Sequence, residues 1–153
     1  MSEDRLPQTD TAEDSMEGYV GPGRDRLPDT REGLTHLVKI GGMNGYITAN
    51  PRPEEGQVKE IFIHGFGQLG STNAGWTNAF AIMLSIGLQF GTELPMLARK
   101  FAHMKFEPNG ETDNPDIPHC HSIPDYIFKW IALHYGTPQL RAELIQIDEE
   151  LSR

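Results

Sequence analysis

Apolar residues are densest between Ile61 and Phe106, and their spacing predicts the central elements of the fold. A short run of strand-forming residues, Ile61 to His64, leads into a glycine-rich turn, and a long apolar stretch begins near Ser71. Within that stretch, residues recur at steps of four and three, the spacing of one helix face: Trp76, Phe80, Met83, Gly87 and Phe90. This stripe predicts a helix buried on several sides, with Trp76 in the core.

Gly91 is a suitable end for that helix, because glycine adopts the left-handed conformation without a Cβ penalty. A second, shorter helix is predicted over roughly Leu94 to Met104. Most of the foldable sequence is expected to pack around this pair of helices.

Three runs before the long helix have the composition of strands. Leu34–Ile40 and Tyr46–Ala49 are separated by Gly-Gly and Asn-Gly pairs, which indicate a hairpin because tight primed turns need positive φ. After a break with two prolines, a third strand is predicted over Val58–His64. The predicted fold class is therefore α+β, a three-stranded antiparallel meander packed against a long buried helix across one sheet face, followed by two to three further helices.

The stretch from Phe106 to Ser122 has three prolines and is long for a plain connection, so we expect it to be functional or to depend on a partner. Ser122 is a predicted N-cap for a helix over 123–134, with Pro124 in its first turn and Asp125 favourably placed in the helix dipole. A last helix is predicted over 139–151.

Residues 1–24 are acidic and almost without apolar periodicity, which predicts a disordered tail ahead of an α+β domain over 25–153. The tail contains a near-repeat. Asp4–Thr9 reads DRLPQT and Asp25–Thr30 reads DRLPDT, and the second copy directly precedes the folded part. Chance repetition in a biased tail is the favoured account, and a lead-in strand docked on the domain is the alternative.

A formal net charge of -9 argues against nucleic acid or an anionic membrane as the main partner, because both favour a basic surface. The sequence has no run of eighteen apolar residues and no secretory signal at its acidic N-terminus, so a cytoplasmic protein is expected. One cysteine, Cys120, excludes a disulfide within one chain.

His119, Cys120 and His121 are weak candidates for a metal site, since imidazole and thiolate are ligands for soft transition metals. Adjacent residues rarely supply a tetrahedral site, so we expect no metal and an exposed or partner-facing loop instead. An incidental cysteine is also favoured over a reactive thiol, because no second cysteine is present.

The glycine-rich turn reads GxGxxG after a strand and before a helix, which makes Gly65, Gly67, Gly70 and Ser71 candidates for binding a nucleotide phosphate. The strands before it form a meander instead of a βαβ unit, and no acidic residue ends a following parallel strand. A tight β-to-α turn is the favoured interpretation.

Lys100, Lys105, Arg99 and Lys129 form a cationic group in the folded half. A solvated helix face is one interpretation, and a docking patch for an acidic partner or for the chain's own acidic tail is the other. Phe106 follows Lys105 and supplies an aromatic anchor beside these charges. Lys100, Lys105, Phe106 and Glu107 are therefore the candidate partner-binding residues.

Nine stretches occur in the order of a known family: Leu27–Arg31, Thr35–His36, Gly45–Thr48, Gly70–Thr72, Ala79–Ala81, Leu88–Gly91, Lys100–His103, Phe106–Gly110 and Ser122–Leu133. Together they resemble the TSCPD domain, found near the C-terminus of long, adenosylcobalamin-dependent (class II) ribonucleotide reductases. The resemblance covers roughly Arg26 to Tyr135.

The family's namesake Thr-Ser-Cys-Pro-Asp string is absent, and so are the cysteines that the reductase chemistry requires. The resemblance therefore implies a detached accessory domain without catalytic residues, inactive alone, which supports a class II catalytic chain in trans during deoxyribonucleotide synthesis. Adenosylcobalamin is implied for that partner and no cofactor for this chain. Such a split would suit a compact genome such as that of a phage. The alternatives are a small nucleotide- or corrinoid-binding module and, last, a stand-alone enzyme using the His/Cys loop.

Overall fold

The computed structural model describes residues 23–151, with side chains as far as Ile145. The elements follow the order β1 (Leu34–Ile40), β2 (Met43–Pro51), β3 (Val58–His64), α1 (Thr72–Gln89), α2 (Leu94–Phe101), β4 (Gly110–Glu111), β5 (His119–Cys120), α3 (Ile123–Tyr135) and α4 (Pro138–Leu151). The predicted α+β class is confirmed. Residues 1–22 of the predicted tail lie outside the described residues.

Strands β1, β2 and β3 form one antiparallel sheet in that order, with Leu37 opposite Tyr46 and Ile47 opposite Ile63. The β1–β2 turn is shorter than predicted. It consists of Gly41 and Gly42, whose φ values of 54° and 87° suit glycine. Alternate side chains point to opposite faces, so one face is buried and the other is open. The buried face carries Val38, Ile40, Ile47, Ala49, Ile61 and Ile63, and the open face carries Leu37, Tyr46 and Phe62.

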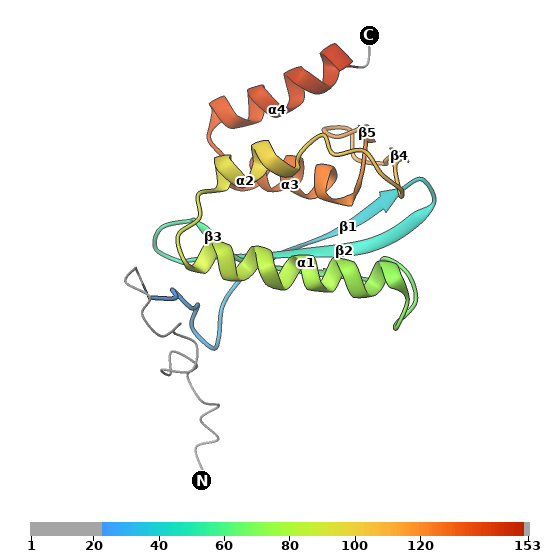
Figure 1. Cartoon of the computed structure of the whole chain (residues 1–153). Coiled ribbons are helices and arrows are strands. Elements are labelled where there is room, and N and C mark those ends of the chain that lie inside the picture. Colours follow the sequence, from blue (N-terminus) through green and yellow to red (C-terminus); the bar gives the residue numbers. More distant parts are fainter. Residues whose placement is uncertain (1–22, 152–153) are drawn as a thin grey trace.

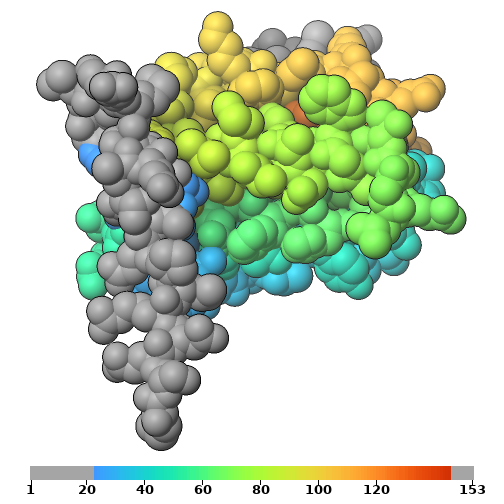
Figure 2. Space-filling view, turned by 60° about the horizontal axis from the view of Figure 1, so that its bottom comes forward, coloured from blue at the N-terminus to red at the C-terminus, as the bar shows by residue number. Residues whose placement is uncertain are grey.

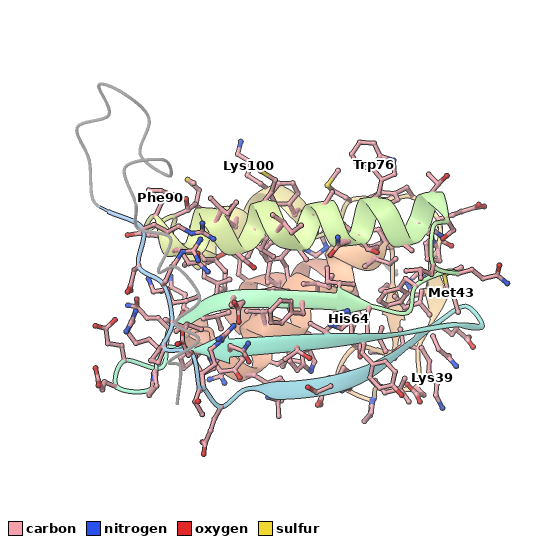
Figure 3. All side chains as sticks on the ribbon, turned by 90° about the horizontal axis from the view of Figure 1, so that it is seen from below. Lys39, Met43, His64, Trp76, Phe90 and Lys100 are labelled. Atoms are coloured by element: carbon pink, nitrogen blue, oxygen red, sulfur yellow. The ribbon has the colours of Figure 1, made fainter. Side chains whose placement is uncertain are left out.

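Helix α1 packs along the outer edge of β3, not across a face of the sheet (Figure 3). The Ser85 hydroxyl accepts a hydrogen bond from the Ile61 N–H at 2.9 Å and donates to the Ile61 carbonyl at 3.1 Å. The Gln89 amide donates to the Lys59 carbonyl at 3.1 Å. These side chains take the place of a neighbouring strand, so α1 closes an edge that would otherwise expose backbone groups.

The predicted core stripe of α1 is wrong. Trp76 is 73% exposed and Met83 is 69% exposed. The buried residues of the helix are Ala81, Leu84, Ser85, Leu88 and Gln89. Because α1 is apolar on both sides, its periodicity fits two stripes equally well, and only the polar pair Ser85 and Gln89 marks the side that meets the sheet.

Helix α3 lies over the buried face of the sheet, α2 lies beside it, and α4 lies on its far side (Figure 1). Its side chains Tyr126, Ile127, Phe128, Trp130 and Ile131 are fully buried. Phe101 of α2 stacks on Phe128 with ring centroids 5.7 Å apart, and Leu140 and Leu144 of α4 join the same core. In the part of the chain that the structure describes, no helix combines the length and apolarity needed to cross a membrane.

The second copy of the near-repeat is docked on this fold, but it is not a strand, because the first strand begins at Leu34. The Asp25 N–H donates to the Gln89 carbonyl at 2.8 Å, and the Asp25 carboxylate forms an ion pair with Arg52. Arg31 follows with two hydrogen bonds to Glu60 at 2.8 and 2.9 Å. The lead-in segment therefore starts at the C-terminal end of α1.

Candidate functional site

The glycine-rich turn forms the start of α1. Gly65, Gly67 and Gly70 all have positive φ, and a Cβ on Gly67 would lie 2.6 Å from the Ser71 hydroxyl. That hydroxyl caps α1 by accepting from the Ala74 N–H at 3.2 Å. The open hollow beside the turn has a volume of about 550 Å³, and its lining includes no lysine or arginine. The local geometry is that of a tight β-to-α turn, and His64 is among the residues that line the hollow.

Along the segment His119–Cys120–His121, the cysteine side chain points to the opposite side from the two histidines. Cys120 is fully buried, whereas the rings of His119 and His121 lie together with centroids 5.2 Å apart. Among residues 23–145, no group of three histidine, cysteine or carboxylate side chains is arranged to hold a metal ion. The segment's structural role is the short ribbon of β4 and β5, which continues the sheet through the bridge between Ile40 and Thr112.

The cationic group splits into three environments. Lys129 is buried and bonded to Asp125, and Arg99 forms an ion pair with Glu143 at 2.8 Å. The interpretation of Lys129 as part of a surface patch is therefore wrong, because its ammonium neutralises a buried carboxylate. Lys100 and Lys105 are exposed, and neither forms a hydrogen bond or ion pair within the described residues. These two lysines remain available to a partner.

An apolar groove lies beside Lys105. It has a volume of about 260 Å³, and polar atoms contribute little to its wall. Its lining comes from the first half of α1, the turn after Lys105 and the start of α3: Asn73, Trp76, Thr77, Phe80, Phe106, Glu107, Pro108, Ile123 and Pro124. The structure thus places Phe106 and Glu107 in one site with Trp76, which the sequence assigned to the core.

The groove has a rigid floor and one fixed wall. Phe80 meets Phe101 edge-on, with ring centroids 5.5 Å apart, and Phe101 stacks on Phe128. On the other side, the Phe106 N–H donates to the His121 carbonyl at 3.0 Å, which holds the turn against the start of α3. A preformed apolar hollow of this kind suits a side chain of a partner better than it suits solvent.

A polar network lies inside the fold, between β1 and α3. The His36 Nε2 and the Tyr126 hydroxyl are 2.7 Å apart, and Asn114 donates to the same hydroxyl at 3.0 Å. His36 also stacks on Trp130, with ring centroids 5.4 Å apart. Burial, followed by the charge of His134, lowers the pKa of His36, and burial raises the pKa of Tyr126. The network suits a neutral imidazole whose Nε2 accepts a hydrogen bond from the Tyr126 hydroxyl.

Comparison with known proteins identifies the family. The model of the TSCPD domain matches residues 18–135. The chain belongs to this family. Its relatives include proteins named vitamin B12-dependent ribonucleotide reductase, so this is a ribonucleotide reductase-related domain. No solved structure matches the chain.

The TSCPD relatives are much longer than this chain. The Streptomyces avermitilis protein is 44% identical over 133 residues, which cover 86% of this chain and 14% of the relative. The Rhodopirellula baltica protein is 39% identical over 137 residues, which cover 86% of this chain and 13% of the relative. The Agrobacterium fabrum protein is 35% identical over 117 residues, or 76% of this chain and 9% of the relative. The chain therefore spans a small part of the reductases it matches.

The start of α3 can be compared with the string Thr-Ser-Cys-Pro-Asp that gives the family its name. His121–Asp125 reads HSIPD, which shares Ser, Pro and Asp with Thr-Ser-Cys-Pro-Asp. Ser122 caps α3 by accepting from the Asp125 N–H, and Asp125 bonds three segments together. Ile123, between the shared residues, lines the apolar groove. Ser122 and Asp125 thus have structural roles here.

Proposed function

We propose that this TSCPD domain is a non-catalytic accessory piece of a B12-dependent ribonucleotide reductase. In this proposal it binds the catalytic chain in trans, in the cytoplasm, and supports the reduction of ribonucleotides to deoxyribonucleotides. The observation that carries the proposal is the match itself, because the family segment makes up 14% of reductases such as the Streptomyces avermitilis protein. Adenosylcobalamin belongs to the partner chain in this proposal.

The position of Cys120 supports a role outside the chemistry. It is the one cysteine in the sequence, and it is fully buried. A thiol that takes part in radical formation or disulfide exchange has to meet its substrate or another thiol. A buried single thiol does neither, so the reacting cysteines are assigned to the partner.

The test uses the Streptomyces avermitilis relative with its matching segment deleted. We expect the shortened reductase to bind the added chain and to form deoxynucleotides faster with the chain than without it. The chain alone, supplied with ribonucleotide, adenosylcobalamin and a dithiol, should form none. Absence of binding to the shortened reductase, or turnover by the chain alone, would overturn the proposal.

A further inference from the structure

The outer side of α1 and the adjoining side of α2 form one exposed surface. Figure 2 shows α1 (green) crossing the visible face beside α2 (yellow), and in Figure 3 the labelled Trp76 and Lys100 project in the same direction, away from the sheet. Met96 lies one turn before Lys100 on α2 and is 52% exposed. We call this the α1–α2 surface. Its exposed apolar members are Trp76, Met83, Met96 and Phe106.

Single apolar residues are common on protein surfaces, but a contiguous group around a hollow marks an interaction site. Here Trp76 and Phe106 stand on two walls of the apolar groove, with Phe80 below them. Aromatic residues beside a pocket are the usual centres of binding energy at interfaces. The volume of about 260 Å³ suits one large side chain.

The charge around the groove indicates the chemistry of its occupant. The charged residue in the groove lining itself is Glu107, whereas Lys105, directly before Phe106, and Lys100 on α2 lie outside the lining and have no acidic partner among the described residues. The unpaired Lys105 next to the groove-lining Phe106, with Lys100 on the preceding helix, favours a ligand that presents carboxylates next to its apolar anchor. The match to reductases of which it covers 14% supplies a source for such a segment, since there the domain is continuous with the reductase chain.

We infer that the apolar groove binds a large apolar side chain of the reductase's catalytic chain, carried on an acidic segment that also meets Lys100 and Lys105. The inference rests on the proposed function and names its docking site. The anchor enters between Trp76 and Phe106, and the two lysines fix its direction and speed its approach.

The test reads the groove directly. The chain has two tryptophans, Trp76 at the groove and Trp130 in the core, so 5-fluorotryptophan labelling gives one ¹⁹F signal for each. Adding the shortened Streptomyces avermitilis reductase should shift and broaden the Trp76 signal at lower partner concentrations than the Trp130 signal. Phe106→Ala combined with Lys105→Glu should weaken binding at least about tenfold, with an unchanged melting temperature.

The matched control is Tyr46→Ala. Tyr46 is 48% exposed and Phe106 is 46% exposed, but Tyr46 lies on the open sheet face. This variant should bind like the wild type. Loss of affinity in Tyr46→Ala with none in the groove variant would place the docking site on the sheet, overturning this inference while the proposed function stands. Absence of binding by the wild type would instead overturn the proposed function.

Two other occupants are separated by experiments without the reductase. A Trp76 signal that moves with the concentration of the domain alone would assign the groove to a second copy. A Trp76 signal that shifts in the full-length variant Glu13→Gln, Asp14→Asn, Glu17→Gln would assign it to the chain's own acidic tail. Either result would overturn the inference, and a Trp76 signal that is constant in both would support it.

Discussion

The carboxylate of Asp125 and the ammonium of Lys129 form a buried ion pair one turn apart on α3, with Oδ1 and Nζ 3.1 Å apart. The Asp125 side chain is 0% exposed and that of Lys129 is 2% exposed. The same carboxylate accepts from the His103 N–H at 2.7 Å and from the His121 N–H at 2.9 Å. One residue therefore joins the end of α2, the segment after β5 and the start of α3, which also fixes the Phe106 turn between them.

Removing one member of this pair should be costly. Lys129→Met leaves a buried carboxylate without its cation, and Asp125→Asn leaves a buried ammonium, so each should lower the free energy of unfolding by about 3–5 kcal/mol. The double variant should lose less than the sum of the two. Urea unfolding measures all three, with Lys105→Met as the exposed-lysine control. A cost for Lys129→Met equal to that of the control would show that the pair contributes nothing.

The parts of the fold that local rules determine were predictable. The strands were marked by their turn glycines, and α3 by Ser122 and Pro124, because these residues act through their own backbone conformation. The boundaries of β2 and of the β1–β2 turn were less certain. Two adjacent glycine-containing pairs offer two turn positions, and the structure uses Gly41-Gly42.

The sequence predicted the wrong environment for residues whose role depends on a distant segment. Trp76 was predicted to be buried because its face of α1 is apolar. Lys129 was predicted to be exposed because a charged side chain usually lies in solvent. Signals were present in both helices. Ser85 and Gln89 are polar residues one turn apart in an apolar helix, and Asp125 and Lys129 are opposite charges at the same spacing. The partner-binding candidates Phe106 and Glu107 lie together at the groove, and their role is still a prediction.

The hydrogen bonds between Ser85 of α1 and Ile61 of β3 should contribute measurably to the free energy of unfolding. Ser85→Ala leaves the Ile61 N–H and carbonyl without their partner in a buried position, and an unsatisfied buried polar group costs about 1–3 kcal/mol. Asn78→Ala, at an exposed position of the same helix, should change stability by no more than about 0.5 kcal/mol. Chemical denaturation of both variants is the measurement. Equal midpoints would mean that water or another group replaces the hydroxyl at the sheet edge.

The two tryptophans should respond in opposite ways to truncation. Trp130 is 1% exposed and packed on His36, so Trp130→Ala should cost about 3–5 kcal/mol, a large part of the stability of a small domain. Trp76→Ala removes a surface side chain and should alter the unfolding free energy by about 0.5 kcal/mol or less. Thermal melts of both variants provide the comparison. A Trp76→Ala variant as unstable as Trp130→Ala would show that Trp76 is part of the core.

The stability of the domain should decrease as the pH is lowered, because His36 takes up a proton more readily in the unfolded chain. Its ordinary pKa is 6.5, and burial, with the charge of His134, lowers the pKa in the folded state, although Asp113 opposes the shift. Between the lowered pKa and 6.5, the unfolded chain binds a proton at His36 that the folded chain does not bind. Stability from this residue is therefore complete above 6.5 and is lost as the pH decreases from 6.5 toward the folded-state pKa.

The measurement is the urea-unfolding free energy across this window for the wild type and for His36→Gln. Glutamine still offers an acceptor to the Tyr126 hydroxyl, but it does not titrate. The variant's free energy should therefore depend less steeply on pH than that of the wild type. His64→Gln is the control, because His64 lies exposed on the open face of the sheet, away from the network around Tyr126. A slope that stays in His36→Gln and disappears in His64→Gln would assign the titration to the open face instead of the network around Tyr126.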